Sequence, residues 1–180
     1  QYDSLPVTVP IHGLSEGKDA RGGSNVAGNP ARNLAVNEDA YAYHLRSYPR
    51  ATSNSHYRYR PEYSPRNAID GDYSPEKYWR PARRTDVWLM VEFGREVEAE
   101  QVVLRLHRRD GQDKTWTGAT LEFSDGERIA IELKNTAEPQ VFAFPKRKCT
   151  WIKLVDFQES FPLGDNGIVE FEVHGQDAGE

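Results

Sequence analysis

A short turn, NAIDGD at positions 67–72, offers the first chemistry in the sequence. Asparagine and aspartate supply oxygen atoms, and a hard cation such as Ca²⁺ binds six to eight oxygens from carboxylates and backbone carbonyls. The same residues are common in ordinary turns, where an aspartate side chain accepts a hydrogen bond from a nearby backbone N–H. The residue types therefore leave two interpretations open, a cation site and a plain turn.

Aromatic rings and arginines occur together in segments 56–63, 78–86 and 107–118. Flat rings stack on the apolar faces of sugars, and arginine binds carboxylates through two parallel hydrogen bonds. From these segments we expect a ligand surface made by Trp79, Arg83, Arg109, Asp110 and Trp116. Each has a structural alternative, because a tryptophan can belong to the core and an arginine can pair with an aspartate. The tyrosine-rich segment 56–63 is the next candidate.

The charge balance indicates which ligands such a surface would prefer. The formal net charge of the chain is -5, so a local group of arginines would contrast with an acidic background. Such a group concentrates anionic ligands. Uronic acids or sulfated sugars therefore fit the expected surface better than neutral galactose.

Alternating apolar and polar residues indicate the elements that position these segments. Period-two alternation is typical of half-buried strands, and turn residues separate most of the runs. Asp125-Gly126 predicts a tight hairpin turn between two of them. A further early strand is expected in AVNEDAYAYHL, residues 35–45. The seven later runs are WLMVEF, QVVLRLH, ATLEFS, RIAIEL, VFAF, TWIKLVDF and IVEFEVHG.

These runs predict an all-β fold, an antiparallel β-sandwich of about eight strands in the style of jelly rolls. Closing the sandwich should bring segments 78–86 and 107–118 near one end. Residues 1–30 are rich in Gly, Pro, Ser and Asn and predict an extended leader or linker. We therefore expect the sandwich in residues 31–176 and a short tail in 177–180.

Length, charge and cysteine content exclude several classes. A chain of 180 residues can form one domain with its own core. It lacks the basic excess of a general nucleic-acid binder, and no stretch approaches the roughly 18 apolar residues of a membrane span. We expect neither a nucleic-acid nor a membrane partner. Cys149 is the only cysteine, so no internal disulfide can form.

Catalytic patterns are weak. The histidines are scattered without metal-ligand spacing, and no serine stands in a GxSxG motif. The remaining catalytic hypothesis is a β-sandwich polysaccharide lyase, with His56 or Tyr57 as base and Arg58 neutralising a uronate. We expect binding without catalysis.

An ordered set of motifs suggests a family. The segments SPRNAIDGDYSPEKYW, WLMVEFGREVEAEQVVLRL, TWIKLVDF and GIVEFEVHG resemble the galactose-binding-like β-sandwiches, which include discoidin or coagulation-factor C-type domains and related carbohydrate-binding modules. The resemblance runs from about Arg32 to Gly175. A closer likeness is to bacterial modules found beside polysaccharide-degrading enzymes, because Arg108-Arg109-Asp110 and Trp116 precede LEFSDG as they do there.

The resemblance implies a structural calcium in the NAIDGD turn. Its ligands would be the carboxylates of Asp70 and Glu170 and the carbonyls of Asn67, Asp72 and Val169. Glu170 alternates with apolar neighbours, so it should point away from the core. The chain departs from the family pattern after Asp70, where Ser74 or a nearby carbonyl must replace a threonine ligand.

The resemblance also implies a function. It predicts a non-catalytic carbohydrate-binding module that recognises an acidic or complex glycan. Its partners would be the glycan and other domains of a larger enzyme, which would be secreted or located at the bacterial cell surface or periplasm. A protein-binding adhesion module on the same fold is the alternative.

Overall fold

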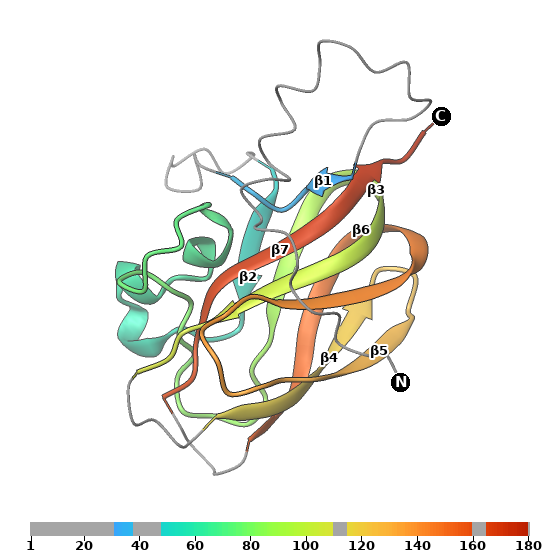
Figure 1. Ribbon diagram of the computed structural model, residues 1–180. Coiled ribbons are helices and arrows are strands. Elements are labelled where there is room, and N and C mark those ends of the chain that lie inside the picture. The colour runs from blue at the N-terminus through green and yellow to red at the C-terminus, as the bar shows by residue number, and fades with distance from the viewer. Residues whose placement is uncertain (1–30, 38–47, 110–114, 160–164, 180) are drawn as a thin grey trace.

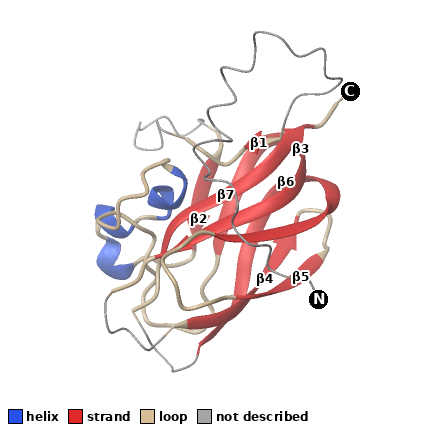
Figure 2. Ribbon diagram, viewed as in Figure 1, coloured by secondary structure: helices blue, strands red, loops and turns tan. Residues whose placement is uncertain are grey.

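The computed structural model describes residues 31–37, 48–109, 115–159 and 165–179 of the chain. This part is built from strands and three short 3₁₀ helices, which lie together at one side of the strands (Figures 1 and 2). The strands are β1 (Arg32–Asn33), β2 (Arg50–Ser53), β3 (Leu89–Leu106), β4 (Trp116–Phe123), β5 (Arg128–Glu132), β6 (Gln140–Glu159) and β7 (Ile168–Asp177). The 3₁₀ helices are η2 (Tyr57–Tyr59), η3 (Pro61–Tyr63) and η4 (Pro65–Ile69).

All strand pairs are antiparallel, and two long strands join the two layers of the sandwich. The hydrogen-bonded order is β1-β7-β3-β6-β4-β5, and β2 also pairs with β3. The first part of β3 pairs with β2 and with the last part of β6, which continues to β4 and β5. The remainder of β3 pairs with β7 and with the first part of β6. One continuous sheet therefore folds over itself, which confirms the predicted all-β sandwich.

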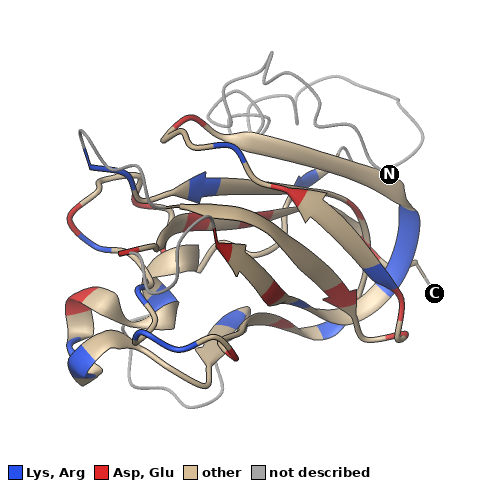
Figure 3. Cartoon of the chain, turned by 90° about the horizontal axis from the view of Figure 1, so that it is seen from below, with Lys and Arg blue, Asp and Glu red and all other residues tan. Residues whose placement is uncertain are grey.

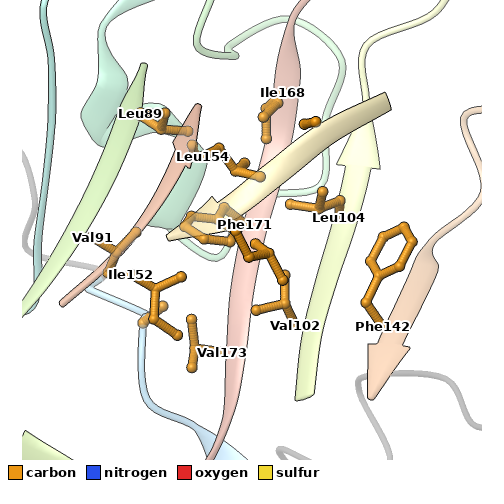
Figure 4. Close-up of a cluster of buried hydrophobic side chains, with 14 of the residues drawn as sticks. Leu89, Val91, Val102, Leu104, Phe142, Ile152, Leu154, Ile168, Phe171 and Val173 are labelled. Atoms are coloured by element: carbon orange, nitrogen blue, oxygen red, sulfur yellow. The ribbon is translucent and has the colours of Figure 1, made fainter. Parts of the chain in front are cut away.

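The core lies between these layers. Alternate residues of the strands face inward, and Figure 4 shows side chains from β3, β6 and β7 meeting there. Leu89, Val91 and Phe93 are fully buried at the start of β3, and Phe171 is fully buried on β7. This is the alternation expected when one face of a sheet packs against another.

The strand count differs from the prediction because neighbouring runs merge. WLMVEF and QVVLRLH are two parts of β3, while VFAF and TWIKLVDF are two parts of β6. Register shifts interrupt the β3–β6 pairing between Glu92 and Val97 and again between Ala99 and Gln101. Bulges of this kind bend a strand, which lets one strand serve two layers. The described residues thus form seven strands, where about eight were expected.

The predicted leader and early strand lie wholly or mostly outside the described residues, and the predicted tail can be compared in part. The expected leader, residues 1–30, lies outside the described residues, as does most of the expected early strand at 35–45. β7 includes Asp177, whose carboxylate binds Arg32 and Arg95, so the folded region reaches into the expected tail.

The predicted hairpin turn is confirmed. Gly126 has φ 88° between β4 and β5, and its N–H donates to the Phe123 carbonyl at 2.9 Å. Asp125 accepts a hydrogen bond from the Glu127 N–H at 3.0 Å. The Asp-Gly pair supplies both the left-handed backbone and the side-chain acceptor that this turn needs.

The segment between β2 and β3 is held by short 3₁₀ turns. Pro61 and Pro65 begin η3 and η4, where the fixed φ of proline suits the first helical position. Asn67 and Ile69 of η4 are fully buried. The polar residues of this segment are therefore carried by a backbone that is tied to the core.

Candidate ligand-binding end and candidate cation turn

Four segments that are distant in sequence meet at one end of the sandwich, which lies toward the bottom of Figure 1. The Tyr57 N–H donates to the Arg80 carbonyl at 2.7 Å, and Trp79 and Ile168 exchange two backbone hydrogen bonds of 2.9 Å. The His107 N–H donates to the Gly167 carbonyl at 2.9 Å. The expected meeting of the loops around Trp79 and His107 is therefore observed.

Arg80 is the centre of this end. It is 9% exposed, and its guanidinium carbon lies 4.0 Å from the ring centroid of Tyr57 and 5.3 Å from that of Tyr63. The same guanidinium forms an ion pair of 2.5 Å with Asp165. Cation–π stacking and a charge-assisted hydrogen bond together hold a buried arginine in one position. Arg80 therefore builds the site, and its exposed neighbours are the ones that can meet a ligand.

Arg83 is an exposed arginine that shares Asp165 with Arg80. It contacts Asp165 at 3.3 Å, and its side chain is 57% exposed. Exposed ion pairs of this length contribute little to stability, because water screens them. Arg83 can therefore turn toward an anionic ligand while Arg80 keeps Asp165 in place.

Tyr78 and His107 stack face to face beside these arginines. Their ring centroids are 3.7 Å apart and the rings are 8° from parallel. The pKa of His107 is lowered to about 4, chiefly by burial and then by the positive charges of Arg109, Arg80 and Arg108. Burial raises the pKa of Tyr78, while the charges of Arg80 and Arg109 act in the opposite direction. Several guanidinium groups thus act on one end of an acidic protein.

Figure 3 shows the charges from below. Lys and Arg residues lie on the helical segment and on loops beside it, with acidic residues among them. Arg109 is exposed and lies at this end, as predicted, whereas Asp110 lies outside the described residues. Of the expected ligand surface, Arg83 and Arg109 are placed where a ligand could reach them.

The prediction that Trp79 and Trp116 belong to the ligand surface is wrong, because both side chains are buried. Trp79 is fully buried, and Trp116 is the first residue of β4 and 1% exposed, so it is not in a loop. Their rings stack at 6.0 Å, and the Trp116 ring lies 4.3 Å from that of Phe157. The Trp79 Nε1–H donates to the Ser55 carbonyl at 3.0 Å, and the Trp116 Nε1–H donates to Glu159 at 3.1 Å. Their large apolar rings close this end of the core and offer no free face to a sugar.

Four residues of this end were missed by sequence reasoning: Tyr63, Tyr78, His107 and Asp165. Tyr63 and Tyr78 did lie inside the aromatic segments, so composition gave a signal for them. His107 was the last residue of the predicted run QVVLRLH, on its polar face. Asp165 lies in a connection without a recognisable motif, and only the fold brings it to Arg80.

The NAIDGD turn meets the last strand. The Gly71 N–H donates to Glu170 Oε1 at 3.2 Å, and the Asp72 N–H donates to Asp70 Oδ1 at 2.9 Å. Gly71 has φ 77°, a left-handed conformation that favours glycine. The plain-turn hydrogen bond is therefore present, and the turn also brings Asp70 and Glu170 together.

The carboxyl groups of Asp70 and Glu170 repel each other, and both are at least partly removed from solvent. Burial raises the pKa of Asp70 to about 6. Burial, and then the charge of Asp70, raise the pKa of Glu170 well above its usual range. Glu170 Oε2 and Asn67 Oδ1 are buried and have no hydrogen-bond partner among the described residues. A divalent cation would offset this repulsion and engage such oxygens, so the residues fit a hard cation.

The other residues expected to bind calcium, Asp72 and Val169, give weaker support for a cation site. Asp72 Oδ1 accepts a hydrogen bond from the Ser74 N–H at 2.9 Å, so this side chain shapes the turn. Val169 is 5% exposed on β7 beside Glu170. Within the described ranges, no group of three or more His, Cys, Asp or Glu side chains could hold a metal. A cation here would therefore rely on two carboxylates together with backbone carbonyls.

A family model decides the membership of the chain. The family described as Domain of unknown function (DUF7402) matches residues 48–174. The chain belongs to this family. No match was found among curated protein sequences.

Solved structures establish the fold of this member of the family. The family 32 carbohydrate-binding module (CBM) of NanJ from C. perfringens, solved with galactose, is 16% identical, and the match covers 69% of this chain and 91% of that one with a TM-score of 0.54. A fucolectin from striped bass (Morone saxatilis) serum is 15% identical, with 82% and 50% covered and a TM-score of 0.63. Truncated AlyQ, with CBM32 and alginate lyase domains, is 16% identical, with 72% and 32% covered and a TM-score of 0.56. The chain therefore has the galactose-binding-like β-sandwich fold.

No helix in the described part of the chain is long and apolar enough to cross a membrane.

Proposed function

We propose that this domain is a non-catalytic carbohydrate-binding module that recognises an acidic glycan. The observation that carries the proposal is the group of guanidinium groups around Arg80, where Arg83 and Arg109 are exposed on a framework of stacked aromatic rings. Guanidinium groups bind carboxylates and sulfates in a planar, two-pronged geometry. A rigid framework reduces the entropy lost when the ligand binds.

The fold supports the same proposal. Structures that share it include carbohydrate-binding modules solved with galactose or with GalNAc-β-1,3-galactose, and a chitosan-binding module. On this fold, function resides in the site and not in the sandwich itself. The arginines of this chain therefore argue for an anionic ligand independently of what any neighbour binds.

A further part of the proposal concerns the setting of the domain. In truncated AlyQ, a CBM32 occurs together with an alginate lyase domain. By analogy, this domain would direct a larger secreted enzyme to its polysaccharide. The analogy rests on the fold and is separate from the argument for the ligand.

We also propose that a structural calcium holds the NAIDGD turn. The carboxylates of Asp70 and Glu170 and the carbonyls of Asn67, Asp72 and Val169 would hold it. The cation would supply charge neutralisation for two buried carboxylates, and its role would be to stiffen the turn. The support is the unpartnered Oε2 of the fully buried Glu170.

The test of the proposed function is a glycan array probed with the domain alone. Retention on uronate-containing or sulfated glycans, with neutral galactosides left unbound, is the expected result. Absence of binding to every glycan, together with capture of a protein, would favour an adhesion module instead. An ultraviolet-absorbing unsaturated product from an acidic polysaccharide would show that the domain is a lyase.

A further inference from the structure

Tyr59 is the most exposed large apolar side chain in the described part of the chain. Its side chain is 85% exposed, compared with 45% for Tyr48. A single exposed aromatic residue is common on protein surfaces and does not by itself indicate a partner. The backbone that carries Tyr59 provides a second, independent observation.

Two successive non-glycine residues at this turn adopt the left-handed conformation. Arg58 has φ 52° and ψ 20°, and Tyr59 has φ 52°. This region is unfavourable for residues with a Cβ atom, because Cβ approaches the following carbonyl oxygen. Such conformations persist only where the surrounding structure enforces them, and they gather at functional sites.

Contacts on both sides enforce the turn. The Tyr57 N–H donates to the Arg80 carbonyl at 2.7 Å, and the Arg60 N–H donates to the Tyr57 carbonyl at 3.3 Å. The guanidinium carbons of Arg58 and Arg80 lie 5.0 Å and 4.0 Å from the centroid of the Tyr57 ring. Tyr57 is thus held against Arg80, while Tyr59, two residues later, reaches solvent.

The immediate neighbours of Tyr59 suit a sugar. The His56 ring lies edge-on to the Tyr59 ring at 5.1 Å between centroids. The pKa of Arg84 is raised chiefly by its hydrogen bonds to Asp86, and the Tyr59 hydroxyl contributes to the same effect. A flat, solvent-facing ring can stack on the apolar face of a pyranose.

Tyr59 belongs to the same end of the molecule as the proposed site. Arg84 follows Arg83 directly in the chain, and the Ala82 N–H donates to Ser55 Oγ at 3.0 Å, which ties the two loops together. A glycan bound at Arg83 could therefore continue along the surface to Tyr59.

We propose that Tyr59 forms a second sugar-stacking subsite, so that the domain binds a stretch of several sugars in an acidic polysaccharide rather than a single terminal sugar. This inference rests on the proposed glycan-binding function. It adds a residue, a place and a dependence on chain length that the proposed function does not require.

The experiment measures affinity against chain length. A uronic acid monosaccharide, its disaccharide and its hexasaccharide are titrated calorimetrically into the parent domain, Tyr59→Gly, Tyr59→Phe and Tyr48→Ala. Glycine accepts a positive φ, so Tyr59→Gly should melt no lower than the parent and the loss of the ring can be studied in a folded protein.

We expect Tyr59→Gly to lose about tenfold in affinity for the hexasaccharide, as expected for one stacking contact, and to bind the monosaccharide like the parent. Tyr59→Phe keeps the ring and should retain the gain with chain length, and Tyr48→Ala, at the other end of β2, should behave like the parent. Equal losses for the monosaccharide and the hexasaccharide, or none for either, would overturn the second subsite. If the parent binds no saccharide, the proposed function fails together with this inference.

Discussion

At the level of single residues, burial separates the side chains that hold the candidate ligand-binding end together from those that can contact a ligand. Trp79, Trp116 and Arg80 are buried and fix the geometry, whereas Arg83 and Tyr59 reach solvent. The sequence indicated several of the residues that gather at this end, but it did not separate those that pack in the core from those that face a ligand. A tryptophan beside polar residues has the same composition signal whether it faces solvent or closes a core.

Replacing Trp116 should therefore destabilise the folded protein and not only weaken binding. Trp116→Ala should cost about 3–5 kcal/mol of unfolding free energy, because it leaves a large cavity next to Trp79 and Phe157. Chemical denaturation followed by fluorescence measures this, with Arg83→Gln as the exposed control that should change stability by less than about 0.5 kcal/mol. A Trp116→Ala variant as stable as the parent would show that the ring is not packed.

At the level of elements, the alternation of the strands was predictable and their continuity was not. The seven predicted runs lie in strands to within one residue at their ends, because the buried face of a sheet imposes period two on the sequence. The merging into β3 and β6 depends on residues between the runs, such as Gly94 with φ 71°, where polar residues conceal that the strand continues. The 3₁₀ turns depend on contacts with distant segments and left no periodic signal.

The close approach of the paired strands β3 and β7 at Gly175 provides a test of this architecture. A Cβ atom at Gly175 would lie 2.9 Å from the Ala99 Cα and still closer to the Glu98 carbonyl oxygen. Gly175→Ala should therefore destabilise the protein by about 1–3 kcal/mol or more, because two strand backbones must separate.

The matched control for this prediction is Gly179→Ala, where a Cβ atom would have no neighbour within 4 Å. Thermal melting of both variants gives the comparison. Equal melting temperatures for the two variants would contradict the close approach of β3 and β7.

At the level of the whole molecule, the proposed calcium would link the segment between β2 and β3 to the last strand. The contact between Gly71 and Glu170 joins residues 99 positions apart in sequence. A ligand that binds only the folded state raises stability by about 2.7 kcal/mol when its concentration is 100 times its Kd. Stability should therefore depend on the cation if the turn binds one.

A chelator should lower the melting temperature of the parent, and calcium should restore it. Asp70→Asn removes one of the two carboxylates and should make melting insensitive to both additions. Asp125→Asn, in the β4–β5 turn, should keep the response of the parent. Identical melting curves for the parent with chelator and with calcium would count against the proposed calcium.

The proposed function was predictable from the sequence only in outline. The motifs indicated the sandwich, and the abundance of arginine and tyrosine indicated an anionic sugar. Which arginines face solvent depends on Asp165 and His107, whose positions arise from the closure of the sheet. Arg83 and Arg109 remain candidate ligand-binding residues because they are exposed, whereas Trp79 and Trp116 do not because they are buried.

Calorimetric titration tests whether the exposed guanidinium groups of Arg83 and Arg109 bind an acidic glycan. Acidic and neutral oligosaccharides of equal length are titrated into the parent, Arg83→Gln, Arg109→Gln and Lys148→Gln, the last removing one positive charge elsewhere. We predict that the parent prefers the acidic ligand, that each arginine variant weakens it about tenfold, and that added salt weakens the parent. Lys148→Gln should match the parent. Equal affinity of the parent for both ligands, or arginine variants that bind the acidic ligand as the parent does, would contradict the proposed binding.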